Sequence, residues 1–325
     1  MKKLLVIIVV VLMLMPLLGC AQHRDKVLLV FSYHPEYAWQ AEETKGVEEV
    51  LVNERVQIEK LSMDTKRNTS AEWIEKITEE AVRKIDEYKP DVVIVFDDNA
   101  CELVAKKYVG KRLPFVFTGM NGEPEDYGFP AENITGVIER HYIVATIDLL
   151  RRLVPDVKEL AIITDNSPTS QGFITDLEKT TLPVPISEVY ATNDFSDWKA
   201  KVEELQLKVD AIGLFQYHTI KEGSGEQSLP PEEVLAWTLQ NSALPDFAFF
   251  DFTIRDGALC GVTVSGYEQG KAAGEIAVKI LKGEKAEDIP IQCPQKGTVI
   301  INATRAKNLG IQIPADILRD AEVER

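Results

Sequence analysis

The residues best placed to do chemistry in this 325-residue chain follow short apolar runs, at the points where strands of a sheet would end. Serine, threonine, asparagine and aspartate recur there, together with tyrosine and tryptophan. Hydroxyl, amide and carboxylate groups can hold the polar parts of a small ligand, and aromatic rings can wall its apolar part. We expect the ligand-binding residues to be Ser32, Tyr33, Trp39, Asp97, Asp98, Asn99, Thr118, Asn121, Asn166, Ser167, Thr169, Tyr217 and Asp251.

Several candidates in the first half of the chain also have a structural interpretation. Tyr33 and Trp39 belong to one aromatic segment after the first apolar run, but Trp39 could equally pack the first helix onto the sheet. A carboxylate among residues 97–99 could hold a ligand ammonium, although aspartate and asparagine also cap helix N-termini. Thr118 and Asn121 follow the next strand and offer a hydroxyl and an amide.

The second half of the chain offers an anion site and a second aromatic wall. Asn166, Ser167 and Thr169 stand at the predicted start of a helix, whose free N–H groups suit a carboxylate. An ordinary N-cap in a solvated loop explains them as well. Tyr217 ends another strand and is our candidate for the opposing wall, while Asp251 could serve either a hinge or the ligand.

The motifs of common enzymes and metal sites are absent from the sequence. It has no GxSxG, no GxxxxGK[ST], no HExxH and no CxxC, and its four histidines are scattered. Asp97 and Asp98 are adjacent, so they need not face each other across a substrate as glycosidase acids do. We therefore expect a binding protein without catalysis, cofactor or metal; a surface enzyme is the minor alternative.

The apolar runs alternate with segments of helical period. Residues 71–88 carry Ile74, Ile77, Ala81 and Ile85 at spacings of three and four, which predicts an amphipathic helix. The following run, DVVIVF, is typical of a parallel strand covered on both faces. The alternation restarts after a helix predicted at 143–153. The sequence thus predicts an α/β fold with two doubly wound parallel-sheet lobes.

The N-terminus and the charge balance predict an exported protein. Lys2 and Lys3 precede an apolar run at 4–15 that is short for a membrane span, and Leu-Leu-Gly then leads into Cys20. This segment looks like the lipobox of bacterial lipoproteins, which implies a signal peptide at 1–19, lipidation of Cys20 and an extracytoplasmic membrane anchor. With 36 basic against 52 acidic residues, the net charge of −16 disfavours nucleic acid as a partner.

Cys101, Cys260 and Cys293 have no close spacing that would indicate a disulfide framework. We expect three small buried hydrophobic side chains. One disulfide between Cys260 and Cys293 is the alternative.

Four segments resemble the substrate-binding lipoproteins of ABC transporters that have the type I periplasmic-binding-protein fold. Within this family they are similar to receptors for tryptophan and tyrosine, and related domains also occur as sensory ectodomains. The segments are VLLVFSYHPEYAWQAEETKGVEEVL, VFDDNA, FVFTGMN and the stretch 257–314, which includes GTVIINATRAKNLGIQIP.

The resemblance implies two lobes joined by a three-strand hinge, with the ligand cleft between them. The crossings are expected near 134–140, 252–257 and 290–297. Lobe 1 would then hold residues 25–135 plus 258–290, and lobe 2 would hold 140–252 plus 297–325. The expected partners are a small molecule, for which an aromatic amino acid is the candidate, and an ABC permease. A lipoprotein that signals ligand occupancy to a membrane sensor is the alternative.

Overall fold

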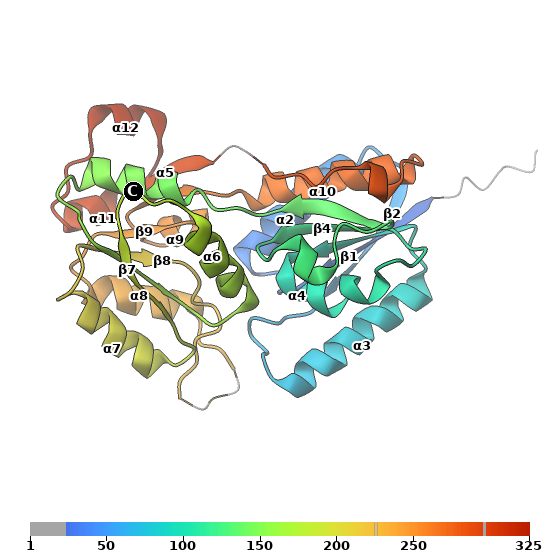
Figure 1. Cartoon of the computed structure of the whole chain (residues 1–325), viewed down its shortest axis with the longest axis horizontal. Coiled ribbons are helices and arrows are strands. Elements are labelled where there is room, and N and C mark those ends of the chain that lie inside the picture. Colours follow the sequence, from blue (N-terminus) through green and yellow to red (C-terminus); the bar gives the residue numbers. More distant parts are fainter. Residues whose placement is uncertain (1–23, 224, 226, 295–296) are drawn as a thin grey trace, which may run out of the picture.

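The computed structural model describes residues 24–223, 225, 227–294 and 297–325. The expected signal peptide and the expected lipidation site at Cys20 lie outside these residues. Two sheets, each flanked by helices, lie side by side along the long axis of the molecule (Figure 1). We call the half built on the first sheet lobe 1 and the half built on the second sheet lobe 2. The predicted α/β fold with two doubly wound lobes is confirmed.

Lobe 1 contains a five-stranded, all-parallel sheet in the order β2-β1-β3-β4-β5. Alternate residues of β1 enter two different hydrophobic clusters, Leu28 and Val30 on one face and Val27, Leu29 and Phe31 on the other. The strands are β1 (Asp25–Phe31), β2 (Val56–Ser62), β3 (Val92–Phe96), β4 (Phe115–Met120) and β5 (Ile134–Ile138).

The helices of lobe 1 cover both faces of this sheet. In α3 the buried residues include Ile77, Ala81 and Ile85, as the helical spacing predicts. Ser70 Oγ accepts a hydrogen bond from the N–H of Trp73 and caps the start of this helix. The helical elements are α2 (Ala38–Leu51), α3 (Ala71–Tyr88), α4 (Asp97–Leu103), η1 (Ala105–Tyr108), η2 (Pro124–Tyr127), α10 (Gly266–Leu281) and η3 (Ala286–Asp288).

Lobe 2 contains a seven-stranded sheet in the order β12-β11-β10-β9-β8-β6-β7, in which only the β10–β11 pair is antiparallel. Its strands are β6 (Leu160–Thr164), β7 (Ile186–Ala191), β8 (Ala211–Leu214), β9 (Asp246–Ala248), β10 (Cys260–Thr263), β11 (Thr298–Asn302) and β12 (Glu322–Glu324). Its helices are α5 (Ile143–Leu153), α6 (Pro168–Lys179), α7 (Phe195–Leu205), α8 (Pro231–Asn241), α9 (Asp251–Arg255), α11 (Ala303–Asn308) and α12 (Ala315–Asp320).

Both sheets reverse their strand order at one point, between β1 and β3 in lobe 1 and between β6 and β8 in lobe 2. The chain connections from the two strands at such a point run in opposite directions, so a crevice forms between them beyond the carboxyl ends of the strands. Open α/β sheets bind their ligands in this crevice. The fold therefore places the ends of β1, β3, β6 and β8 at the candidate site.

One predicted boundary between the lobes is wrong. We expected the second crossing near 252–257 and residues 258–290 in lobe 1. Instead, residues 251–255 form α9, which connects β9 to β10 within the same sheet. The chain returns to lobe 1 only after β10, where α10 packs on α2. Because β10 pairs with β9 and β11, residues 260–263 belong to lobe 2.

The three described cysteines form no disulfide. Cys101 and Cys260 are buried, and Cys293 is partly buried. The alternative of a Cys260–Cys293 bond is thus not found. Among the described residues, no helix is both long enough and apolar enough to cross a membrane.

Candidate functional site

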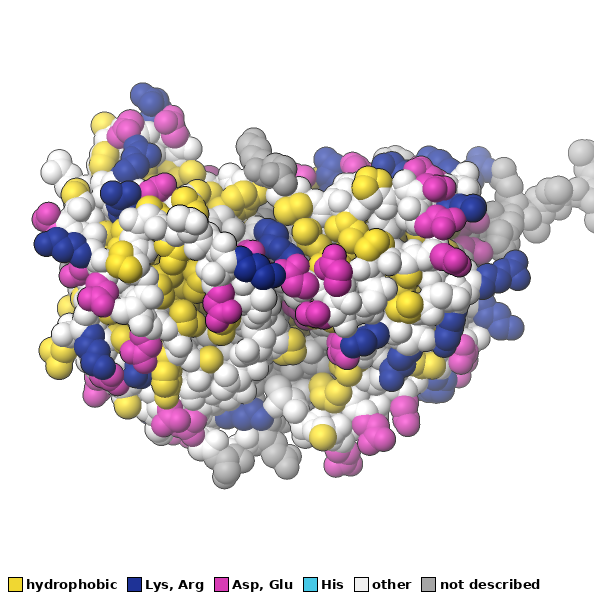
Figure 2. All heavy atoms as spheres, in the orientation of Figure 1, with side chains coloured by type: hydrophobic (Ala, Val, Ile, Leu, Met, Phe, Trp, Pro, Cys, Tyr) yellow, Lys and Arg dark blue, Asp and Glu magenta, His cyan; other side chains and the backbone are white. Residues whose placement is uncertain are grey.

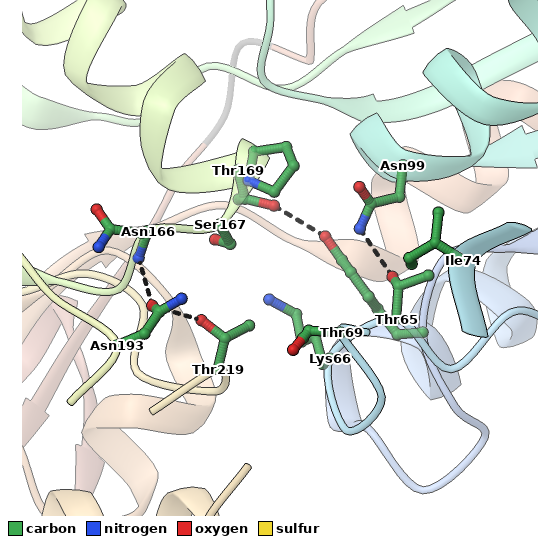
Figure 3. A pocket seen from close by; sticks show the side chains of 12 residues that line it. Thr65, Lys66, Thr69, Ile74, Asn99, Asn166, Ser167, Thr169, Asn193 and Thr219 are labelled. Atoms are coloured by element: carbon green, nitrogen blue, oxygen red, sulfur yellow. Dashed lines mark hydrogen bonds between the residues drawn. The ribbon is translucent and has the colours of Figure 1, made fainter. Parts of the chain in front are cut away.

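A cavity of about 200 Å³ lies between the lobes at the carboxyl ends of the strands (Figure 3). Its wall comes from both lobes, and hydroxyl and amide side chains predominate in it. A hydrogen bond of 2.9 Å between Tyr33 Oη and Thr169 Oγ1 joins the two lobes at this wall. The lining residues are Tyr33, Thr65, Lys66, Thr69, Ile74, Asn99, Asn166, Ser167, Pro168, Thr169, Asn193 and Thr219.

The lobe 1 wall is held by the loops after β1 and β2 and by the first turn of α4. Thr65 Oγ1 donates to the carbonyl of Ser32 and accepts from the side-chain amide of Asn99, so it ties the three segments together. Ser32 itself lies behind the wall, fully buried, with its Oγ donating to the Phe96 carbonyl.

Lys66 brings the cavity its charge. Its side chain is 2% exposed, and its Nζ donates a hydrogen bond of 3.1 Å to Gln216 Oε1 of lobe 2. The ammonium also lies 4.4 Å from the ring centre of Tyr33 and 5.3 Å from that of Tyr37. Burial lowers the pKa of Lys66, while nearby carboxylates, Asp165 foremost, oppose this shift.

The lobe 2 wall is organised by Asp165, which is completely buried. Its Oδ1 accepts from the N–H of Ser167 at 3.0 Å and from Ser170 Oγ at 2.8 Å, and its Oδ2 accepts from the N–H of Thr219. One carboxylate thus fixes both the start of α6 and the loop after β8. Despite its burial, the nearby charge of Lys66 and the hydrogen bonds from Ser167 and Ser170 keep the pKa of Asp165 below its usual value.

Asn193 completes this wall from the loop after β7. Its Oδ1 accepts from the N–H of Asn166 at 2.8 Å and from Thr219 Oγ1 at 3.0 Å (Figure 3).

A group of buried acidic residues lies behind the cavity, in lobe 1 and at its hinge. Asp97, Asp98 and Glu139 each have one carboxylate oxygen without a hydrogen-bond partner, and Glu43 has two. Burial raises the pKa of all four carboxyls. Asp97 also has a φ of 65°, a strained conformation for a non-glycine residue.

The carboxyl groups of Glu43 and Asp97 lie close together beside Gly119. A Cβ atom added to Gly119 would be 2.7 Å from Glu43 Oε1 and 2.9 Å from Asp97 Oδ1. Two adjacent buried carboxyls do not both ionise easily, so we expect at least one of them to be protonated in the folded protein.

Replacing Glu43 by glutamine is expected to stabilise the protein by about 1–3 kcal/mol at pH 7–8, because the amide supplies a hydrogen for Asp97 and removes a buried acid. The raised pKa means that the folded state keeps a proton that the unfolded chain releases above about pH 4.3. Glu43 therefore destabilises the fold increasingly as the pH rises above that value.

Urea unfolding of both proteins at pH 4.5 and pH 7.5 measures this effect, with Glu75→Gln on the exposed face of α3 as the control. The increase in the free energy of unfolding caused by Glu43→Gln should be small at pH 4.5 and larger at pH 7.5. An equal gain at both pH values would refute the proton linkage.

The lobes also meet at a second place, where α6 contacts the loop after β4. A Cβ on Gly172 would lie 2.7 Å from the carbonyl carbon of Asn121 and 2.8 Å from the nitrogen of Gly122. Nearby, Glu123 accepts hydrogen bonds from Lys179 of α6 and from Arg140 of the first crossing. Figure 2 shows basic and acidic side chains meeting at the middle of this face, between the lobes.

Five of the predicted site residues line the cavity: Tyr33, Asn99, Asn166, Ser167 and Thr169. Six others lie behind its wall. Trp39 Nε1 donates to Asp97 at 2.9 Å, and Asp98 Oδ1 accepts from the N–H groups of Asn121 and Gly122. These six residues are Ser32, Trp39, Asp97, Asp98, Thr118 and Asn121.

Two predicted site residues lie elsewhere. Tyr217 is buried in the hydrophobic cluster on the far face of the sheet, where its hydroxyl contacts Thr253 Oγ1. The neighbouring His218 turns toward lobe 1 instead and contacts Tyr37 with the ring centres 4.8 Å apart. Asp251 accepts from the N–H of Phe252 and pairs with Arg255. The predicted ligand-binding roles of Tyr217 and Asp251 are therefore not supported by their positions.

The residues missed by the sequence analysis come mainly from the loops after β2 and β7. Thr65, Lys66 and Thr69 follow β2, and Asn193 follows β7. Both strands are parallel to their neighbours, so their carboxyl ends reach the same edge. The rule that identified the other loops would have identified these two loops as well, but not which of their side chains enter the cavity.

Among the described residues, no group of three or more histidine, cysteine, aspartate or glutamate side chains is arranged to hold a metal ion. The cavity is lined by hydroxyls, amides, one ammonium, the ring of Tyr33 and the apolar side chains of Ile74 and Pro168.

The family model for ABC transporter substrate binding proteins matches residues 30–324. The chain belongs to this family. Members of such a family bind solutes, and the predicted resemblance to type I periplasmic binding proteins is confirmed.

This substrate-binding protein is also similar to individual proteins. A tyrosine-binding protein of Clostridioides difficile is 24% identical over 215 residues, which span 62% of this chain and 58% of the relative. An ABC domain from Streptococcus pneumonia, solved in complex with L-Trp, matches with a TM-score of 0.73 at 20% identity, over 93% of this chain and 100% of that one.

The ligand-free, open form of a substrate-binding protein with adhesive properties from Clostridium difficile matches with a TM-score of 0.65. It is 17% identical, over 93% of this chain and 99% of the other. At these identities the likeness to solved structures concerns the fold.

Proposed function

We propose that this substrate-binding protein is the extracytoplasmic, lipid-anchored receptor of an ABC importer and that it closes its lobes on an aromatic amino acid. The observation that carries the proposal is the cavity between the lobes, bridged by the hydrogen bond between Tyr33 and Thr169. Its volume suits a ligand of metabolite size, smaller than the drug-sized ligands that fill most pockets.

The ligand class is supported by the groups in the wall and by the relatives. Tyr33 offers a ring face, the start of α6 suits a carboxylate, and Asn99 and Asn166 offer amide oxygens to an ammonium. One similar protein is a tyrosine-binding protein, and another was solved in complex with L-Trp. Lipid attachment at Cys20 and delivery to a permease are parts of the proposal that rest on the N-terminal sequence and on the family.

A thermal-shift screen of amino acids, sugars, nucleosides and purines tests the ligand class. Tyrosine or tryptophan should raise the melting temperature, because a ligand at a hundredfold excess over its Kd stabilises the folded state by about 2.7 kcal/mol. The shift should be lost in Tyr33→Ala and kept in Tyr267→Ala, whose ring lies on α10 away from the cavity.

Shifts with sugars or nucleosides alone would contradict the amino-acid proposal and leave a solute receptor. Mass spectrometry of the released ligand checks that binding leaves it chemically unchanged, as expected for a receptor without catalysis. Uptake of the labelled ligand by cells with and without the gene then tests transport. Binding without an effect on uptake would favour the sensing role.

A further inference from the structure

The charge in the cavity wall is of one sign, and this restricts the class of ligand further. Of the twelve described residues that line it, Lys66 alone carries a charge, and no carboxylate side chain is among them. Figure 3 shows the amine of Lys66 pointing from lobe 1 into the space between Ser167 and Thr219 of lobe 2. A ligand in this cavity meets a buried positive charge at close range.

This ammonium is incompletely satisfied. It has three hydrogens to donate. Among the described residues it donates one hydrogen bond, to Gln216, and otherwise faces the rings of Tyr33 and Tyr37, which accept no conventional hydrogen bond from it. Asp165, the carboxylate with the strongest influence on Lys66, already accepts hydrogen bonds from Ser167, Ser170 and Thr219. A buried charge with few partners is costly unless a further group of opposite charge is supplied.

The opposite wall offers a second donor to the same space. Pro168 has no N–H, and the N–H of Ser170 is bonded to Ser167 Oγ. Within the described contacts this leaves the N–H of Thr169 as a first-turn donor of α6 without a partner. The twelve-residue helix directs the positive end of its dipole to the same place.

We infer that the ligand is recognised through a carboxylate held between Lys66 of lobe 1 and the first turn of α6 in lobe 2. The anion then bridges the lobes, and its binding energy drives their closure. This assignment rests on the proposed function and deepens it, since it names the group of the ligand that the receptor requires. Lys66 is the specificity-determining residue.

Calorimetric titration of four proteins tests the assignment: the unaltered chain, Lys66→Met, Lys66→Arg, and Lys158→Met as a control at an exposed lysine of lobe 2. The probes are tryptophan and tyrosine, the same molecules without the carboxylate (tryptamine and tyramine), and the same molecules without the amine (indole-3-propionate and 3-(4-hydroxyphenyl)propionate). Circular dichroism and the ligand-free melting temperature verify that each variant folds.

Lys66→Met should bind the amino acids about 10- to 150-fold more weakly, which is the range for a lost hydrogen bond to a charged group. The affinity should fall less in Lys66→Arg, and it should not change in Lys158→Met. The amines should bind the unaltered protein weakly and show no further loss in Lys66→Met, because the interaction that they lack is the one that the variant removes. The amine-free acids should show the same loss as the amino acids.

Equal binding of tryptophan or tyrosine to Lys66→Met and to the unaltered protein would overturn the assignment and leave the proposed function intact. The assignment would also be overturned if Lys66→Met lowered the affinity for the amines by the same factor as the affinity for the amino acids. If the wider screen yields only an uncharged ligand, both the aromatic amino acid and the carboxylate site are refuted, while a solute receptor remains. If it yields a different carboxylate whose affinity falls in Lys66→Met, the assignment holds and the amino-acid proposal fails.

Discussion

Gly172→Val is expected to weaken ligand binding by about 100-fold or more and to leave the lobes unable to close. The new side chain would start 2.7–2.9 Å from backbone and Cβ atoms of Asn121 and Gly122. Backbone atoms cannot rotate away, so the clash is relieved only by separating α6 from lobe 1. The apparent Kd then rises in inverse proportion to the population of the closed form, and 100-fold corresponds to about 2.7 kcal/mol.

Titration calorimetry gives the affinity, and small-angle X-ray scattering with and without ligand follows the closure. The unaltered protein should become more compact on binding, and the variant should not. Glu178→Val, on the exposed side of the same helix, controls for the effect of a β-branched residue on α6. Normal affinity and normal compaction in Gly172→Val would show that the contact at Gly172 is unnecessary for closure.

Arg305→Met is expected to destabilise the protein by about 3–5 kcal/mol, the usual result of removing one partner from a buried ion pair. The Arg305 Nε donates to Asp246 Oδ2 at 2.7 Å, and its other nitrogens donate to the carbonyls of Leu239 and Ser242. Asp246 is 3% exposed and also accepts from the N–H of Leu259. Without Arg305 its charge would remain buried with one hydrogen bond from the backbone.

Urea unfolding of Arg305→Met, Asp246→Asn and the double variant measures this pair. The double variant should lose less stability than the two single variants added together, because it leaves no uncompensated charge. Arg319→Met, an exposed arginine of α12, should change stability by less than about 0.5 kcal/mol. Strictly additive losses would contradict the coupling.

The periodicity of the sequence was sufficient to predict the architecture. The run at 92–96 is apolar at every position, as a strand buried on both faces requires, and the helical stripe at 71–88 matches α3. These signals are local, because burial on one or two faces constrains every residue of the element itself. The assignment of β10 failed because strand partners are chosen over long sequence distances, and β10 pairs with β9 and β11.

The site was predicted in part, since the ends of parallel strands lie at one edge of the sheet whatever the sequence. This rule identified Tyr33, Asn99 and Thr169. It says nothing about the direction of a side chain. Tyr217 and His218 are adjacent, yet Tyr217 packs beneath the sheet and His218 faces the other lobe.

By itself, the sequence determined the two α/β lobes and the strand ends that bear polar residues, because each depends on neighbours along the chain. Only the tertiary structure decided that Lys66 enters the cavity, that Gly172 lies against Asn121, and that Arg305 pairs with Asp246. In a polar loop, a lysine has the same pattern whether it meets water or a ligand. Lys66 is enclosed by the opposite lobe, which lies about 150 residues away in the chain. The approach of that lobe removes water from the ammonium, and this strengthens the attraction between the ammonium and an anion.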